Sequence, residues 1–341
     1  MEATVKKKDL PASVDLGDLL AQPLAPLDFV LPGFVRGTVG GLVSPGGVGK
    51  SFWALEVAVA MSAGGRADLT GLQPAAGRVL MLSKEDPLEA FQHRLHALAQ
   101  ELPRSVRLGA LDYRSCLGMG IDLMEPSWFE VICEAATGAR LLILDTLTRF
   151  HSLDENSTQD MNQLLAQLER LAAVSGASVL FLHHTSKAAA LSGQGTLQQA
   201  ARGSSVLVDN ARWVAFLAVM TESEARQFDV QPTQRQQYVR WNISKQNYGA
   251  ALPDVWYRRG EGGVLLPVTL KAQKAAVSNL VRERVDEDEG PEIQAGGVTL
   301  TPFAQAQTTP LETYGLAVSK RATRPAAVSL PTATGAFGGQ W

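Results

Sequence analysis

The residues between positions 44 and 51 have the types and spacing needed to hold a phosphate group. They read SPGGVGKS, follow the apolar run Thr38–Val43 and precede the apolar segment Phe52–Met61. Glycines lack a Cβ, so the backbone can curl and turn successive N–H groups toward an anion at the positive end of the following helix. The match to G-x-x-x-x-G-K-[ST] departs at its first position, where Ser replaces Gly. The residues expected at the phosphates are Ser44, Pro45, Gly46, Gly47, Val48, Gly49, Lys50, Ser51 and Phe52.

Two side chains of this segment have separate expected roles. Lys50 would reach the β- and γ-phosphates of a nucleotide, and the Ser51 hydroxyl would ligate Mg²⁺. A glycine-rich turn with an incidental lysine is the alternative. The strand-like run before the loop and the helix-like run after it favour phosphate binding.

Acidic residues follow two other apolar runs. Asp145 comes directly after Leu141–Leu144, and Glu85 follows a similar run near position 82. Ligands of open α/β sheets bind at the carboxyl ends of the strands, so Asp145 is predicted to organise the metal rather than to cap a turn. Glu85 is predicted to be the general base that polarises the attacking water. Asp86 stands before Pro87, which predicts a helix N-cap at Asp86.

His183 and His184 end the apolar run Ser178–Leu182, beside the same edge. A polar side chain there can touch a γ-phosphate and report its presence to the following loop. The alternatives are a buried histidine satisfied by backbone groups and a metal site, but alternation along a strand sends the two side chains to opposite faces. We expect His184 to be the sensor because it lies nearer the loop.

Arg202 and Arg212 come too late in the chain to belong to the phosphate pocket of their own subunit. Each suits an arginine finger given in trans to a neighbouring subunit. An ion pair between Asp209 and Arg212 on a solvated surface is the alternative for Arg212. The sequence leaves both interpretations open.

The elements that would position these residues alternate along the chain. Strands that alternate with helices predict an α/β fold with a parallel sheet and helices on both of its faces. Three of the strand segments are continuously apolar, which is typical of central strands. The predicted strands are Thr38–Val43, Arg78–Leu82, Leu141–Leu144 and Ser178–Leu182, and the predicted helices are Ser51–Ala63, Leu88–Glu101, Pro126–Thr137 and Thr158–Val174.

The sheet is expected to continue after residue 212. Trp213–Val219 is apolar and rich in β-forming residues, and Thr221-x-x-Glu224 has the pattern of a capping box before a short helix. Gln237–Ser244 and Val255–Arg258 are predicted to be antiparallel strands added at the C-terminal side.

These patterns divide the chain into three parts. Residues 1–23 form a mobile N-terminal arm, residues 24–270 form one domain with apolar packing already at Ala25–Arg36, and residues 271–341 form a low-complexity, mostly disordered tail. A short helix is predicted at Ala272–Val285. Lys187–Gln199 has no apolar period and is predicted to be a long loop that faces solvent or a ligand.

Composition and charge limit the function classes. The chain has 341 residues, 45% of them apolar, and a formal net charge of −3. That is enough for a substantial core, while nucleic-acid binding would require local cationic surface. No stretch is apolar for long enough to span a bilayer, and no signal peptide follows the N-terminal lysines, so a cytoplasmic protein without a membrane partner is expected. Cys116 and Cys133 are expected to be reduced, mostly buried thiols.

Six separated motifs occur in an order that resembles the RepA hexameric replicative helicases of broad-host-range plasmids, a branch of the RecA/DnaB-type ATPases. The resemblance runs from about Pro23 to about Leu270. A phosphate loop alone would not single out this branch. The motifs are Ser44–Ser51, Leu82–Pro87, Leu141–Phe150, Phe181–Lys187, Arg202–Trp213 and Ser244–Gly249.

The resemblance implies a RecA-like core, a homo-hexameric ring with ATP and Mg²⁺ between neighbours, and 5′→3′ translocation on single-stranded DNA. It also implies that Arg212 is the finger, with Arg202 a second interface candidate, and that Glu85, Asp145 and His184 keep the roles given above. A replication initiator or a primase is a further partner. Because few residues precede Ser44, no collar domain of the DnaB type is expected.

Two functions from different classes remain open. One is a DNA-dependent ring helicase, and the other is a RecA-class ATPase that remodels a protein partner without unwinding. In a ring, Thr148–His151 and the Lys187–Gln199 loop would face the pore, where Arg149 and Lys187 can pair with phosphates. Phe150 or His151 could stack on bases, with core packing as the alternative for Phe150. A small-molecule phosphotransferase lacks support, since no arginine-rich lid segment is present.

Overall fold

The structure is a computed structural model that describes residues 10–184, 205–249, 251–272, 294–295 and 298–299. The chain divides into two units, Met1–Ala275 and Ala276–Trp341. The described residues of the second unit form one antiparallel pair, β12 (Gln294–Ala295) and β13 (Val298–Thr299). The predicted loop Lys187–Gln199, Arg202 and all but the first residue of the predicted helix Ala272–Val285 lie outside the described residues.

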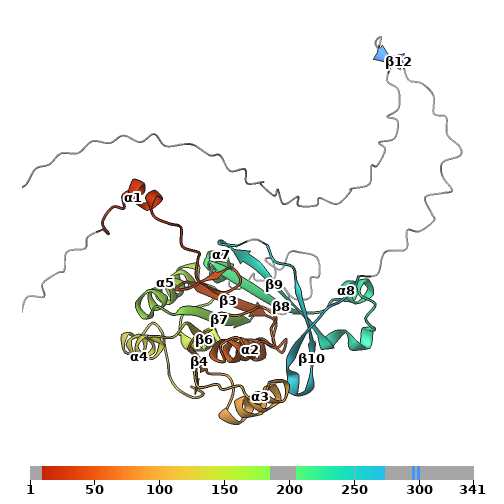
Figure 1. The fold of residues 1–341 in the computed structure, drawn as a ribbon, viewed down its shortest axis with the longest axis horizontal. Helices are drawn as coiled ribbons and strands as arrows, with labels where there is room; N and C mark the ends of the chain where they lie inside the picture. Colours follow the sequence, from red (N-terminus) through yellow and green to blue (C-terminus); the bar gives the residue numbers. More distant parts are fainter. Residues whose placement is uncertain (1–9, 185–204, 250, 273–293, 296–297, 300–341) are drawn as a thin grey trace, which may run out of the picture. The chain divides into compact units, whose positions relative to one another are not determined.

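The first unit is built on one nine-stranded sheet (Figure 1). Six adjacent strands pair in parallel, and three strands with antiparallel pairing extend the sheet on one side. In spatial order the strands are β11 (Leu265–Val268), β10 (Val255–Arg259), β9 (Tyr238–Gln246), β8 (Trp213–Val219), β3 (Val39–Ser44), β7 (Ser178–His184), β6 (Leu141–Asp145), β4 (Val79–Ser83) and β5 (Leu111–Ser115).

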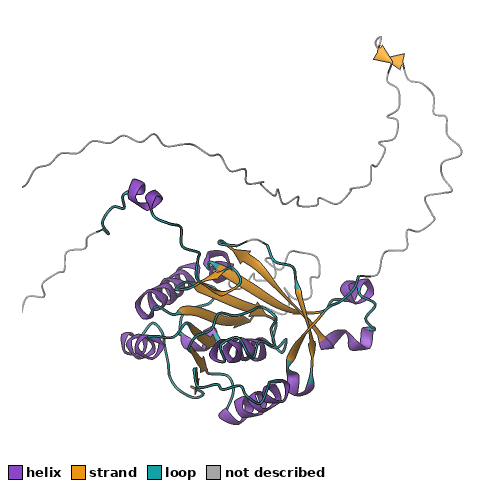
Figure 2. Ribbon diagram, in the orientation of Figure 1, coloured by secondary structure: helices purple, strands orange, loops and turns teal. Residues whose placement is uncertain are grey.

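Helices cover both faces of this sheet, as the alternation of elements predicted (Figure 2). Side chains of one strand divide between two hydrophobic clusters. In β6, Leu142 and Leu144 pack with two helices on one face, whereas Leu141 and Ile143 pack with a third helix on the other. The first face carries α4 (Pro126–Ala136) and α5 (Thr158–Ser175), and the second carries α2 (Lys50–Ser62).

Apart from Ala272–Val285, the predicted strands and helices are confirmed, with ends that differ by at most two residues. The three continuously apolar segments became β4, β6 and β7, which all lie in the interior of the sheet. The two edge strands, β5 and β11, were not predicted. β5 has the sequence LDYRS with no fully buried residue, and β11 contains Pro267, so neither shows an apolar run.

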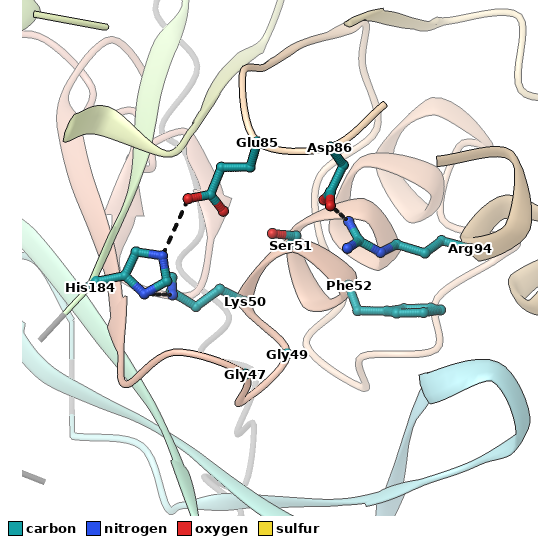
Figure 3. Close-up of a pocket in the computed structure, with 9 residues that line it drawn as sticks. All are labelled: Gly47, Gly49, Lys50, Ser51, Phe52, Glu85, Asp86, Arg94 and His184. Atoms are coloured by element: carbon teal, nitrogen blue, oxygen red, sulfur yellow. Dashed lines mark hydrogen bonds and ion pairs between the residues drawn. The ribbon is translucent and has the colours of Figure 1, made fainter. Parts of the chain in front are cut away.

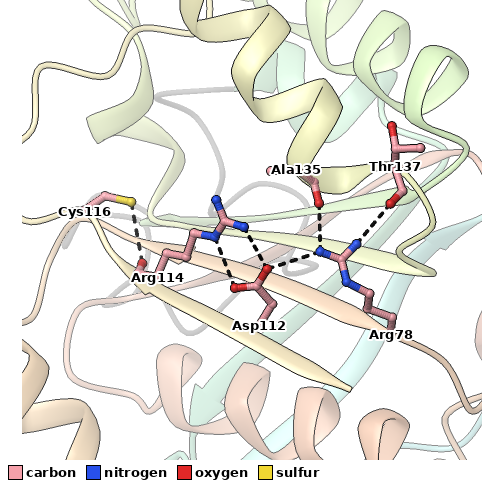
Figure 4. A network of polar contacts seen from close by, with 6 residues as sticks. All are labelled: Arg78, Asp112, Arg114, Cys116, Ala135 and Thr137. Carbon is pink, nitrogen blue, oxygen red and sulfur yellow. Dashed lines mark hydrogen bonds and ion pairs between the residues drawn. The ribbon is translucent and has the colours of Figure 1, made fainter. Parts of the chain in front are cut away.

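A polar network holds the edge strand β5 against the rest of the sheet (Figure 4). The Arg78 guanidinium donates to the Asp112 carboxylate at 3.2 Å and to the Ala135 carbonyl at 2.9 Å, at the C-terminal end of α4. Arg114 donates to the same carboxylate at 2.9 Å. These hydrogen bonds lower the pKa of Asp112, with Arg114 the main cause. Charged hydrogen bonds thus add to the packing of Leu111 and Tyr113 in fixing this strand.

Of the two helix caps that the sequence predicts, one is confirmed. Thr221 and Glu224 form the predicted capping box of α8 (Glu222–Gln227). The predicted N-cap at Asp86 is wrong, because α3 (Leu88–Glu101) has Pro87 as its N-cap and no side chain caps it. Asp86 lies one residue too early to reach the free N–H groups of the helix, and its carboxylate pairs with another side chain instead.

The N-terminal segment contains more structure than the sequence indicated. A short helix, α1 (Leu16–Ala21), lies in the predicted arm, where the Asp15 carboxylate accepts the N–H groups of Gly17 and Asp18. The apolar stretch Ala25–Arg36 forms β1 (Phe29–Leu31) and β2 (Phe34–Val35). The Phe34 ring stacks on Trp213 with 5.0 Å between centroids, so this stretch packs on the core as expected.

Two further expectations concern the described residues. Within them, no helix is both long and apolar enough to cross a bilayer. Cys116 and Cys133 are both free and buried, as predicted.

Glu56 is a buried carboxyl group on α2, with 1% of its surface exposed. Its Oε1 accepts the backbone N–H of Leu265 at 2.7 Å, whereas Oε2 has no hydrogen-bond partner. Burial is the main reason that its pKa rises to about 8 from an ordinary 4.5. A protonated Glu56 therefore joins α2 to the edge strand β11 at neutral pH.

The raised pKa of Glu56 predicts a pH-dependent stability. Between pH 4.5 and about 8 the folded chain holds a proton that the unfolded chain has released, so the free energy of unfolding falls as the pH rises through this window. The Gln in Glu56→Gln keeps the acceptor for Leu265 and cannot ionise. We expect this variant to match the wild type near pH 5 and to exceed it at pH 9 by at least about 1 kcal/mol, since one pKa unit corresponds to about 1.4 kcal/mol.

Thermal unfolding at pH 5, 7 and 9 measures this difference. Glu261→Gln, which neutralises an exposed carboxylate, is the matched control and should follow the wild type. Parallel pH curves for wild type and Glu56→Gln would show that Glu56 is ionised in the folded chain.

Candidate functional site

The glycine-rich segment forms a tight loop between β3 and α2. Gly47 and Gly49 have φ values of 76° and 113°, a region that favours glycine, and Gly49 is the N-cap of α2. Ser44, at the position where the pattern has glycine, is buried, and its hydroxyl donates to the Pro45 carbonyl at 2.8 Å. The loop therefore leaves the first N–H groups of α2 without intrahelical partners, as a phosphate site requires.

The carboxyl ends of four parallel strands bring the predicted residues to this loop (Figure 3). The Lys50 ammonium lies 3.0 Å from His184 Nδ1, and His184 Nε2 lies 3.4 Å from the Glu85 carboxylate. With Nδ1 as the acceptor for Lys50, Nε2 carries the proton and faces Glu85. Thr146 donates its hydroxyl to the same Glu85 oxygen at 2.9 Å. Lys50, His184 and Glu85 thus form one continuous polar chain.

This polar chain sets the charge states of its members. The hydrogen bond from His184 is the main cause that lowers the pKa of Glu85 to about 2, and Thr146 adds to it. Glu85 is therefore ionised at neutral pH, and these hydrogen bonds make it a weak proton acceptor as long as they persist. Lys50 is 4% exposed, and burial lowers its pKa to about 8 against the opposing effects of Asp145 and Glu85.

Asp145 lies at the end of β6 with no exposed surface. Neither of its carboxylate oxygens accepts a hydrogen bond of normal geometry from the described residues. Burial raises the pKa of Asp145 to about 6, an effect that the nearby Ser51 hydroxyl partly offsets. A buried carboxylate with free lone pairs beside a hydroxyl suits a hard divalent cation such as Mg²⁺. The residues present therefore fit the predicted metal.

Lys50, Glu85 and His184 line a pocket of about 250 Å³ together with an ion pair that no sequence pattern indicated. Arg94 lies 2.6 Å from the Asp86 carboxylate, and both side chains face the pocket above Phe52 (Figure 3). Arg94 lies on α3 outside any recognised sequence motif. No sequence pattern singles out Thr146 either. The lining residues are Gly47, Gly49, Lys50, Ser51, Phe52, Glu85, Asp86, Arg94 and His184.

Arg212 does not join this pocket in its own chain. It is exposed and immediately precedes β8, whose first residue, Trp213, pairs with Gly40 near the amino end of β3. The loop leaves β3 at its carboxyl end, beyond Ser44. Arg212 therefore lies at the amino ends of the parallel strands, away from the loop. Arg212 and Asp209 are both described and form no ion pair, which removes the alternative role for Arg212. Arg202 and Lys187 lie outside the described residues.

Thr148–His151, the segment predicted to contact DNA, has one side chain in the core and others at the surface. It folds as a 3₁₀ helix, η1 (Leu147–Phe150). Phe150 has no exposed surface, so its predicted base stacking is wrong and core packing holds. Arg149 has 57% of its side chain exposed, and its Nε lies 3.8 Å from the Glu85 carboxylate. His151 is half-buried, and its Nδ1 accepts the Leu153 N–H at 3.2 Å.

The chain matches one protein family and is similar to two solved structures. Residues 4–190 match the family described as "AAA domain". Among solved structures, the chain is similar to the ATPase domain of G40P, with 15% identity and a TM-score of 0.49 over 69% of this chain and 87% of that one. It is similar, with the same identity and TM-score, to a DnaB-like replicative helicase studied for its interactions with primase, of which it covers 58%. The family match includes Lys50, Glu85, Asp145 and His184.

The lowered pKa of Lys50 predicts how phosphate binding depends on pH. Below about pH 8 the ammonium is charged and attracts phosphate oxygens, whereas above this value the free chain loses the proton. We expect the Kd for ADP to be constant between pH 7 and 7.5 and to rise by up to about tenfold per pH unit above pH 8, as for one linked proton. Titration calorimetry between pH 7 and 9.5 measures this slope.

Lys50→Arg is the control for this titration, because a guanidinium stays protonated over the whole range. Its affinity for ADP should be weaker but without a break near pH 8. A break of equal size in both proteins would assign the titration to another group.

Proposed function

Since the chain belongs to the AAA domain family, whose match covers more than half of it, we propose that it is an ATPase with its nucleotide site at the carboxyl edge of the parallel sheet. The observation that carries the proposal is the polar chain of Lys50, His184 and Glu85 beside the glycine-rich loop. An ammonium group and an ionised carboxylate in one pocket support a site that binds phosphate and activates water.

Each residue has a role that follows from its surroundings. Lys50 and the loop N–H groups hold the β- and γ-phosphates. Ser51 and Asp145 would hold Mg²⁺, which neutralises the charge that develops on the transferred phosphoryl group. Glu85 is ionised, and it becomes the acceptor for the proton of the attacking water once the His184 hydrogen bond that holds its pKa near 2 is released.

His184 links the phosphates to the base. Without nucleotide it accepts from Lys50 and faces Glu85. A γ-phosphate competes for the same ammonium, so its arrival releases Nδ1 of His184 and changes the hydrogen bond at Glu85. This exchange of partners makes His184 the sensor of the γ-phosphate.

Substitutions at the two ends of the polar chain separate binding from hydrolysis. We expect Lys50→Ala to lose both ATP affinity and turnover, because the lysine stabilises phosphate charge in both states. Glu85→Gln should keep ATP affinity within about threefold and lower kcat by about 10²-fold or more, since a general base acts only on the water. Equilibrium binding of ATP and steady-state phosphate release measure the two quantities.

Glu89→Gln, which neutralises an exposed carboxylate on α3 close in sequence to the base, is the matched control and should leave both quantities unchanged. An equal loss of ATP affinity in Lys50→Ala and Glu85→Gln would sink the assignment of Glu85 as the base.

The finer proposal is a homo-hexameric, RepA-like helicase with ATP between subunits and single-stranded DNA in the pore. Two observations support it beside the sequence resemblance. Arg212 is exposed at the amino ends of the parallel strands, whereas its own pocket lies at their carboxyl ends. As an arginine finger it would therefore serve a neighbouring chain. Arg149 is exposed next to Glu85, so a phosphate bound there would lie beside the base. A replication initiator or a primase remains the proposed protein partner.

A DNA-dependent motor should hydrolyse ATP faster when single-stranded DNA is present. We expect stimulation that falls as salt rises, because each neutralised phosphate releases a counterion. Lys187→Ala should lower the ratio of stimulated to unstimulated turnover and flatten the slope of log K against log salt by about one unit. Turnover with a poly-dT oligonucleotide at several salt concentrations measures both effects.

Lys271→Ala, at an exposed lysine near the end of the domain, controls for the loss of one positive charge. Turnover that ignores single-stranded DNA would overturn the helicase proposal and favour an ATPase that remodels a protein partner.

A further inference from the structure

One side chain from the antiparallel part of the sheet reaches the back of the phosphate loop. Arg259, the last residue of β10, donates from its guanidinium to the Gly47 carbonyl at 3.3 Å and to the Val48 carbonyl. Its Nε also donates to the Gln236 carbonyl at 3.3 Å. Arg259 thus makes three hydrogen bonds to backbone carbonyls, two of them from Nη2 to the loop, although it follows the loop by more than 200 residues.

The planarity of the peptide group gives these contacts a direction. In a trans peptide, the carbonyl of one residue and the N–H of the next point to opposite sides. When Arg259 holds the carbonyls of Gly47 and Val48 on one side, the N–H groups of Val48 and Gly49 are turned to the other. Glycine at positions 47 and 49 would otherwise let these peptide planes rotate at little cost.

We propose that Arg259 is a positioning residue that fixes the phosphate loop with its N–H groups facing the phosphate side before nucleotide binds. The role suits arginine, whose rigid planar fork can hold two acceptors in a set geometry, whereas lysine presents a single rotatable charge. Pre-orientation stabilises the complex because the loop has less conformational freedom to lose on binding. The inference rests on the proposed nucleotide site and deepens it.

The hairpin that carries Arg259 is itself fixed to the pocket. The 3₁₀ turn η4 (Glu261–Gly263) joins β10 to β11, and Val264 and Leu266 pack with Phe52 of α2 in one hydrophobic cluster. A Cβ at Gly262 would lie 2.5 Å from the Ala97 Cβ of α3, so the turn approaches α3 as closely as its backbone permits.

The loop and the hairpin are also in van der Waals contact. A Cβ at Gly49 would lie 3.4 Å from the Arg259 guanidinium and 3.4 Å from Leu265. The antiparallel hairpin therefore forms the back wall of the phosphate loop, and Arg259 is its polar contact with the loop backbone.

Binding of a fluorescent ADP analogue to three variants tests the proposal. Loss of two charge-assisted hydrogen bonds should raise the Kd by about ten- to a hundredfold in Arg259→Ala. Arg259→Lys keeps the charge and the aliphatic stem but not the fork, so we expect it to fold normally and to recover at most a small part of the affinity. Arg258→Ala removes the same charge from the neighbouring, exposed residue of β10 and should bind within about twofold of the wild type.

A second readout separates loop positioning from a general loss of stability. In spectra of protein labelled with ¹⁵N-glycine and recorded without nucleotide, the amides of Gly47 and Gly49 should shift in both Arg259 variants, while the melting temperature of Arg259→Lys stays close to that of the wild type.

The outcomes distinguish this inference from the proposed function. Failure of the wild type to bind the ADP analogue would overturn the nucleotide site itself. Wild-type binding with unchanged affinity in Arg259→Ala would overturn the positioning role alone. Full recovery of affinity in Arg259→Lys would also overturn it, since a point charge near phosphate would then suffice.

Discussion

The site depends on the burial of a single ammonium group. Lys50 has 4% of its surface exposed, and a lone charge in such a place would cost several kcal/mol. The parallel arrangement of β3, β4 and β7 supplies the compensation, because their carboxyl ends bring His184 and Glu85 to the same point. Glu85 is kept ionised by the contacts that compensate Lys50, so one electrostatic requirement fixes both the cation and the base.

The parallel and the antiparallel strands of the sheet contribute different contacts to this site. The parallel strands present the side chains that face the phosphates. The antiparallel strands contribute no group to that face, but they support the loop from behind through Arg259 and bind α2 through the Glu56 carboxyl. A helix that begins at Lys50 and carries a buried acid at position 56 is thus held at both its start and its second turn. The position of the phosphate loop is consequently a property of the whole sheet.

The sequence alone predicted the parts of this structure that depend on local patterns. The apolar runs of β4, β6 and β7 and the glycines of the loop each imply one conformation, and the acid or histidine at a strand end is then placed by the topology. Asp86, Phe150 and Arg259 depend on non-local geometry. α3 begins at Leu88 as predicted, so Pro87 rather than Asp86 is its N-cap, and Asp86 pairs with Arg94 instead. A 3₁₀ turn places Phe150 in the core. Arg259 gave no signal, because its acceptors are backbone carbonyls that any sequence provides.

The two edges of the described sheet share a property that bears on how copies of this chain can associate. An edge strand normally offers a row of free N–H and C=O groups to another strand. At one edge, β5 carries the paired charges of Asp112 and Arg114, and at the other, β11 contains Pro267, which has no N–H to donate. Both edges therefore resist the addition of a strand from outside. These two edges therefore favour association through side chains and loops over the formation of one continuous sheet.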